Sequence, residues 1–181
     1  MRVNIVTLGC SKNLVDSEFI GARLERAGYR VEYDSGALTH DIAIINTCGF
    51  ITPAKEESIN TILAYVQAQE EGKIGKLYVT GCLSQRYRED LKQEIPEVRR
   101  YFGVHDTADL LQELKVDYRK ELIGERKLAT PGHYAYMKIA EGCNRNCAFC
   151  AIPLIRGRQQ SVPMEELVQQ ARNLTEKGVK E

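Results

Sequence analysis

The sequence lacks three features that would assign it to a broad class at once. It has no net charge, with 25 basic and 25 acidic side chains, so its composition does not support a strong electrostatic hold on nucleic acid. It has no apolar stretch approaching the roughly 18 residues of a membrane helix. Its first residues read as a strand and not as a charged segment followed by a long apolar run. We therefore expect a soluble, cytoplasmic protein.

Cysteine is the residue type that carries the most information. Six cysteines without an export signal are better explained as metal ligands or reactive thiols than as disulfides, because cytosolic thiols stay reduced. Three of them, Cys143, Cys147 and Cys150, have the spacing C-x3-C-x2-C, and no cysteine follows them. A four-iron cluster normally takes four thiolates, so this set would leave one iron open to another ligand.

Two other interpretations of these three cysteines remain open from spacing alone. A zinc site could use the same thiols together with a distant fourth ligand. The cysteines could also be inert, since buried cysteine often acts as a small hydrophobic residue.

The first part of the chain alternates short apolar strands with amphipathic helices. We predict strands at residues 4–8, 41–47, 76–80 and 101–104, because each is a short apolar run rich in β-branched or aromatic residues. We predict that helices follow them, beginning near Asp16, at an N-cap Thr52 before Pro53, after Cys82 and near Asp106. This alternation predicts an α/β fold with an open parallel sheet and helices on both faces.

The other three cysteines occupy equivalent places in this pattern. Cys10, Cys48 and Cys82 each follow the carboxyl end of a predicted strand. Loops at that edge of a parallel sheet gather residues from distant parts of the chain, and ligands bind there. The pattern therefore predicts a second metal centre. The alternative is three independent loop thiols, each beside a glycine that permits a tight turn.

The composition changes after Leu114, and we predict three segments. Residues 1–125 form the α/β domain, 126–135 a linker, and 136–181 the start of a second domain. A strand at 134–139 would lead into the Cys143 loop, and a helix would begin within 161–166. One βα unit cannot close a parallel barrel, so we expect the second domain to be incomplete.

Four motifs together identify a family resemblance. Residues 8–18 (LGCSKNLVDSE), 46–50 (NTCGF), 79–83 (VTGCL) and the Cys143 loop closely resemble those of the radical S-adenosylmethionine methylthiotransferases. Residues 9–13 and 130–136 are similar to the branch of this family that modifies ribosomal small-subunit protein 12. The resemblance implies that the second domain is the first βα unit of a partial radical S-adenosylmethionine barrel.

The resemblance also implies cofactors and residue roles. It implies two 4Fe-4S clusters and S-adenosylmethionine. The cluster on Cys143, Cys147 and Cys150 would cleave S-adenosylmethionine to a 5′-deoxyadenosyl radical, with Phe149 near the adenine. A second cluster would present the sulfur, and its ligands would be Cys10, Cys48 and Cys82. A carbon radical can take hydrogen from an unactivated C–H bond, so the expected product is a 3-methylthio-aspartate.

The implied partners are ribosomal small-subunit protein 12, an electron donor such as flavodoxin or ferredoxin, and a sulfur donor. We expect no membrane partner, and we expect this chain to be inactive by itself. Alternative functions are methylthiolation of a tRNA adenosine, a non-catalytic iron-sulfur carrier, and a zinc-stabilised domain.

Several charged and polar residues have simpler explanations. We expect the isolated histidines to be surface or capping residues; they are His40, His105 and His133. We expect a solvated face to hold Arg86, Arg88, Arg99 and Arg100. Lys12 and Asn13 lie beside the first cysteine loop, and we hypothesise that they contact a bound sulfur species.

Overall fold

The computed structural model describes residues 1–116 and 125–181. Within these residues, the first part of the chain forms one five-stranded parallel sheet in the order β2-β1-β3-β4-β5. The strands are β1 (Arg2–Thr7), β2 (Arg30–Tyr33), β3 (His40–Thr47), β4 (Ile74–Gly81) and β5 (Arg100–Tyr101). The prediction of a parallel α/β fold is confirmed. The edge strand β2 was not predicted, because it is short and only Val31 in it is fully buried.

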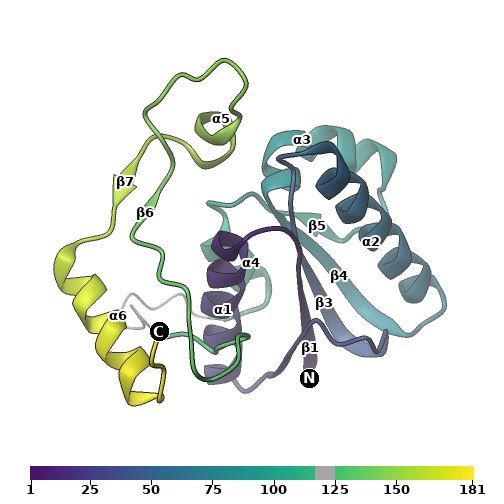
Figure 1. Cartoon of the computed structure of the whole chain (residues 1–181). Helices are drawn as coiled ribbons and strands as arrows, with labels where there is room; N and C mark the ends of the chain where they lie inside the picture. The colour runs from purple at the N-terminus through teal and green to yellow at the C-terminus, as the bar shows by residue number, and fades with distance from the viewer. Residues whose placement is uncertain (117–124) are drawn as a thin grey trace.

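Helices cover both faces of the sheet, as predicted (Figure 1). Helices α1 (Ser11–Arg26) and α4 (Thr107–Glu113) pack on one face, where Ile20, Leu24 and Leu110 meet the strands in one apolar cluster. Helices α2 (Thr52–Glu70) and α3 (Cys82–Glu94) pack on the other, where Ile62 and Leu83 join a second cluster. Two apolar layers therefore fix the sheet and the loops at its edge.

The helix starts differ from two predictions. Helix α1 begins at Ser11 rather than near Asp16, because the chain turns directly from Cys10 into the helix and buries Asn13 in the first turn. The N-cap of α2 is Ile51 rather than Thr52, and Thr52 is already helical with Pro53 beside it in the first turn. Proline suits that position because its missing N–H would have no intrahelical partner.

The second part of the chain differs most from the prediction. Its regular elements are β6 (Ala140–Glu141), α5 (Ile152–Arg156), β7 (Gln160–Ser161) and α6 (Met164–Glu176). The predicted strand at 134–139 is wrong. Within the described residues no parallel strand lies beside that segment, and the backbone instead pairs antiparallel between β6 and β7. The predicted helix near 161–166 is confirmed as α6.

A buried ion pair joins the two parts of the chain. Arg126 donates from Nε and Nη2 to Glu18 Oε2 on α1, at 2.9 and 2.6 Å, and both side chains are almost fully buried. Arg126 also donates to the Tyr136 carbonyl. The predicted linker thus packs on α1 over the residues that the structure describes, while positions 117–124 lie outside them. The three domain boundaries stay predictions.

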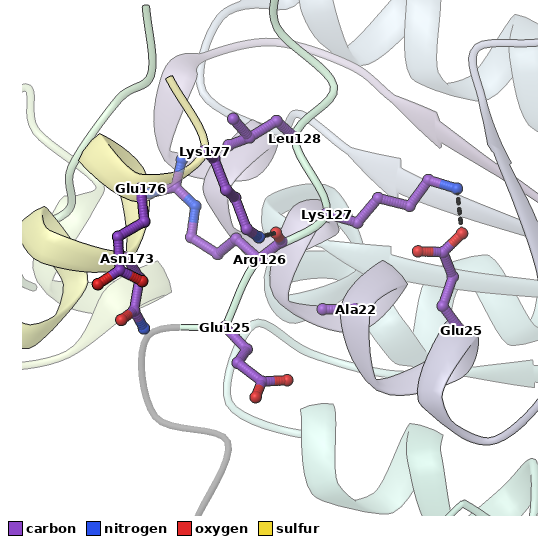
Figure 2. Close-up of a pocket in the computed structure, with 9 residues that line it drawn as sticks. All are labelled: Ala22, Glu25, Glu125, Arg126, Lys127, Leu128, Asn173, Glu176 and Lys177. Carbon is purple, nitrogen blue, oxygen red and sulfur yellow. Dashed lines mark hydrogen bonds and ion pairs between the residues drawn. The ribbon is translucent and has the colours of Figure 1, made fainter. Parts of the chain in front are cut away.

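A polar pocket of about 690 Å3 lies at the same junction (Figure 2). It is lined by α1, residues 125–128 and the end of α6, where Lys177 donates to the Arg126 carbonyl and Lys127 pairs with Glu25. None of its lining residues is a cysteine. Among the described residues, no helix is both long and apolar enough to cross a membrane.

Candidate metal centres

The three cysteines at the strand ends lie on loops that touch one another. Cys10 precedes α1, Cys48 follows β3, and Cys82 is the first residue of α3. Gly9 has φ +94°, and a Cβ placed on it would lie 2.6 Å from Cys48 Cβ, so the first two loops are in direct contact. A Cβ on Gly49 would lie 2.6 Å from the Leu83 Cα, so the second and third loops are in contact as well. The structure therefore brings these cysteines together at the carboxyl edge of the sheet.

Asn13 ties all three loops to one side chain, and it is fully buried. Its Nδ2 donates to the carbonyl of Leu8 at 2.8 Å and to that of Thr47 at 3.0 Å. Its Oδ1 lies 3.7 Å from the sulfur of Cys82. One amide therefore fixes the backbone just before Cys10 and Cys48 and reaches Cys82 itself.

The three cysteines of the first site differ in their exposure to solvent. Cys10 is exposed, whereas Cys48 and Cys82 are buried. Burial raises the pKa of the Cys82 thiol, and the positive charge of Arg156 opposes this shift. The nearby Cys10 and Cys48 add to the rise, because neighbouring thiolates repel one another. A ligand could therefore enter beside Cys10 and meet two thiols that are shielded from water.

The second cysteine loop is held by its own backbone. The Cys143 amide donates to the Gly157 carbonyl at 3.1 Å, and the Cys150 amide donates to the Cys147 carbonyl at 3.1 Å. Cys147 is exposed, while the other two cysteines are half-buried. Phe149 points into solvent with 92% of its surface exposed.

A polar pocket of about 560 Å3 lies beside this loop. It is lined by Cys143, Asn144, Asn146, Pro153, Arg158 and Gln159. These side chains and the open space suit a polar, hydrogen-bonding ligand next to the cysteines.

No three His, Cys, Asp or Glu side chains in the described ranges are grouped closely enough to hold a single metal ion. The ligands of one zinc ion must all lie about 2 Å from the same point. The thiolates of a four-iron cluster bind different irons and are spaced more widely.

A network of charged side chains connects the two cysteine sites. Glu141 on β6 accepts from Lys138 at 2.7 Å and from Arg156 at 2.8 Å, and Asp16 on α1 accepts from the same two cations. Lys12 lies 3.4 Å from Glu141. Burial alone would raise the pKa of Glu141, but these three cations lower it to about 2. Glu141 is therefore a carboxylate at neutral pH.

Sequence reasoning placed Lys12 and Asn13 beside the first cysteine loop but did not find their partners. The side chain of Asn13 is occupied by backbone acceptors and Arg156, and Lys12 also donates to the Ala140 carbonyl at 3.0 Å. Asp16, Lys138 and Glu141 were not singled out, because the contacts of Asp16 with Lys138 and of Lys12 with Glu141 join residues more than 120 positions apart.

The other polar residues mostly follow the predictions. His105 and His133 are exposed, whereas the prediction for His40 is wrong. His40 is 3% exposed on β3, with its Nε2 3.0 Å from Glu32 Oε2, because the strand begins there rather than after it. Arg99 and Arg100 pair with Glu113 on the surface, and Arg88 pairs with Asp106.

The structure defines a class of protein with two cysteine sites. One site lies at three strand ends of a parallel α/β domain, and the other lies on a loop with three cysteines further along the chain. The chain belongs to the family described as uncharacterized protein family UPF0004, which matches residues 2–103. Residues 137–181 match the radical SAM superfamily.

The similar curated proteins are more specific. The chain is 54% identical over 180 residues to the ribosomal protein uS12 methylthiotransferase RimO of Cytophaga hutchinsonii, and 55% identical over 179 residues to that of Phocaeicola vulgatus. The alignments cover 99% of this chain and 41% of each relative, so the chain spans about two fifths of their length. The resemblance to methylthiotransferases that the motifs predicted is confirmed.

Two solved structures share the fold at low sequence identity. The methyltransferase TsrM from Kitasatospora setae, a radical S-adenosylmethionine enzyme, matches 98% of this chain and 46% of its own, with a TM-score of 0.62 and 12% identity. The cobalamin-dependent S-adenosylmethionine radical enzyme OxsB matches 98% of this chain and 32% of its own, with a TM-score of 0.57 and 15% identity. These likenesses support the fold alone.

Proposed function

We propose that the chain forms the cluster-binding part of a methylthiotransferase that modifies an aspartate of ribosomal protein uS12. The observation that carries the proposal is the meeting of three cysteine loops at one sheet edge, in a chain 54% identical to a uS12 methylthiotransferase. The reaction replaces a hydrogen on an unactivated carbon with a methylthio group.

The residues of the first site suit an iron-sulfur cluster. Cys10, Cys48 and Cys82 would hold one 4Fe-4S cluster, leaving one iron without a protein thiolate. Cys10 is exposed, so a sulfur species or a substrate could approach from that side. Asn13 would hold the loops in place, because its buried side chain already contacts two backbone carbonyls and the Cys82 sulfur.

The residues of the second site suit a cluster that also takes S-adenosylmethionine. Cys143, Cys147 and Cys150 would hold the second 4Fe-4S cluster. The Arg145 amide lies 3.4 Å from Cys143 Sγ and would stabilise a thiolate there. Phe149 is exposed and would cover the adenine, while the polar pocket beside Cys143 offers amides and Arg158 to the rest of the ligand.

When bound, the clusters and S-adenosylmethionine would supply hydrogen abstraction and sulfur transfer. The protein would bind and orient the clusters and S-adenosylmethionine and shield them from water. The parallel sheet fixes one cysteine site, the β6–β7 pair carries the other, and the charged network between them sets how the two face each other.

The proposed partners follow from this chemistry. They are uS12 as substrate, an electron donor such as flavodoxin or ferredoxin, and a sulfur donor, all in the cytoplasm. We also propose residues 1–125 and 136–181 as the two functional units, with 126–135 between them.

Two experiments test the proposal. Adding S-adenosylmethionine to anaerobically reconstituted protein should perturb one of two cluster signals in electron paramagnetic resonance. Deleting the gene should remove a methylthio mass increment from an aspartate peptide of uS12, and restoring the gene should bring it back, but not with Cys48→Ala. Loss of a methylthio nucleoside from tRNA, with uS12 unchanged, would identify the other substrate and contradict the proposal.

A further inference from the structure

Arg156 belongs to the second cysteine region but reaches into the first. It ends helix α5, six residues after Cys150, and it is only 3% exposed. Its Nη2 donates to Asn13 Oδ1 at 2.6 Å and lies 3.5 Å from Cys82 Sγ. Its Nη1 donates to Glu141 Oε2 at 2.8 Å and to Asp16 Oδ2 at 3.2 Å. One guanidinium therefore contacts both cysteine regions.

Arg156 and the charged side chains around it carry one more positive charge than negative charges. Lys12, Lys138 and Arg156 provide three positive charges, while Asp16 and Glu141 provide two negative ones. Among the described residues, the other group that Arg156 contacts and that can carry a negative charge is the Cys82 thiol. A metal-bound thiolate at Cys82 would complete the balance, because a cysteine ligates metal in its charged form.

We propose that Arg156 is a positioning residue that joins the two cysteine sites by holding Cys82 and Asn13 of the first site against β6 of the second. The hydrogen bond to the Cys82 sulfur gives it a second effect, because a cationic donor to a ligand sulfur stabilises the more negative, reduced form of a cluster. This inference rests on the proposed function in so far as both sites hold clusters.

Arginine is the residue type that this position requires. Its planar, forked guanidinium reaches four acceptors at once, whereas lysine offers a single point charge on a flexible stem. Arg156→Lys therefore keeps the charge but loses the fork. Arg156→Gln removes both. Arg172→Gln is a matched control, because Arg172 is exposed on α6 and makes no hydrogen bond or ion pair within residues 1–116 and 125–181.

The first test uses the metal-free chain and is independent of any cluster. In hydrogen exchange, Arg156→Gln should raise the exchange rate of peptides over 138–143 and 11–17 by about tenfold, since losing hydrogen bonds to a charged group favours local opening. Arg156→Lys should lie between, and Arg172→Gln should match the unsubstituted chain. Exchange rates equal to the control in both Arg156 variants would overturn the proposal.

The second test asks whether Arg156 acts on the first cluster. In a chain carrying Cys143→Ala, Cys147→Ala and Cys150→Ala, a redox titration followed by electron paramagnetic resonance would report the first cluster alone. Arg156→Gln should shift its midpoint potential to a more negative value and lower iron retention about ten- to a hundredfold. An unchanged potential would overturn the electrostatic part of the proposal.

The two tests also separate this proposal from the proposed function. If the triple variant binds no iron, the proposed first cluster fails. The exchange comparison in the metal-free chain still decides whether Arg156 joins the two regions.

Discussion

The two cysteine sites are built in different ways. The first takes one cysteine from each of three loops, spread over more than 70 residues, and a buried asparagine and two apolar layers hold the loops together. The second takes its cysteines from one short loop, with one of them exposed and few contacts beyond its own backbone. The first site should therefore depend on the whole fold, and the second on local sequence and on its attachment to the first.

The largest loss of stability should come from removing the buried ion pair between Glu18 and Arg126, which joins the two parts of the chain. Glu18→Ala leaves the buried Arg126 without its carboxylate partner and should lower the free energy of unfolding by about 3–5 kcal/mol. Glu25→Ala removes the more exposed pair with Lys127 and should cost less than about 1 kcal/mol. Urea unfolding of both variants measures the difference. Equal losses would mean that the buried pair does not anchor residues 126–136.

The next largest loss of stability should come from a substitution at the first cysteine site, and the matching substitution at the second site should have little effect. Asn13→Ala removes the side-chain donor to the part-buried carbonyl of Leu8 and to the buried carbonyl of Thr47, and should cost about 2–3 kcal/mol. Asn144→Ala removes an exposed amide beside the second site and should change stability by less than about 0.5 kcal/mol. Urea unfolding and iron analysis of the reconstituted variants check both, and Asn13→Ala should lose the first cluster while keeping the second.

The stability that the charged network between the two sites provides should fall as the pH is lowered. Glu141 has its pKa lowered from 4.5 to about 2, so the unfolded chain binds the proton more readily than the folded chain. Its stabilisation is complete above about pH 4.5 and is lost as the pH falls toward 2. We expect Glu141→Gln to cost on the order of 2 kcal/mol at pH 7 in the metal-free chain.

The measurement is the difference in unfolding free energy between Glu141→Gln and the unsubstituted chain at several pH values. This difference should shrink below pH 4.5. A difference that stays constant down to pH 2.5 would contradict the role of Glu141 as a paired carboxylate.

The smallest effect on stability should come from Phe149. Its side chain is exposed, so Phe149→Ala should change the unfolding free energy by less than about 0.5 kcal/mol. The same variant should weaken binding of S-adenosylmethionine to the reconstituted protein, measured by the ligand concentration that perturbs the cluster signal. Unchanged affinity would remove Phe149 from the proposed site.

The sequence predicted the first region better than the second because its signals are local and repeated. Buried parallel strands are short apolar runs, and each cysteine follows one of them, so topology alone places the three loops at one edge. The start of α1 at Ser11 was missed because Asn13, a polar residue, is buried there for its hydrogen bonds and not for burial of apolar surface.

The second region could be recognised from its cysteine spacing, but its strands could not be predicted. The apolar and aromatic run at 134–139 predicted a strand, yet a strand needs a neighbour, and β6 finds only β7 within the described residues. The role of Arg156 was not predictable either, since its partners Asn13 and Cys82 lie 143 and 74 positions away. Such contacts exist only once both regions have folded against each other.

The most direct test of two separate cluster sites is the iron and sulfide content of anaerobically reconstituted protein. We predict about eight irons in the unsubstituted chain and about four in either Cys48→Ala or Cys147→Ala, since each change should destroy one four-iron cluster. Zinc in place of iron, or the loss of all iron in both single variants, would contradict the account.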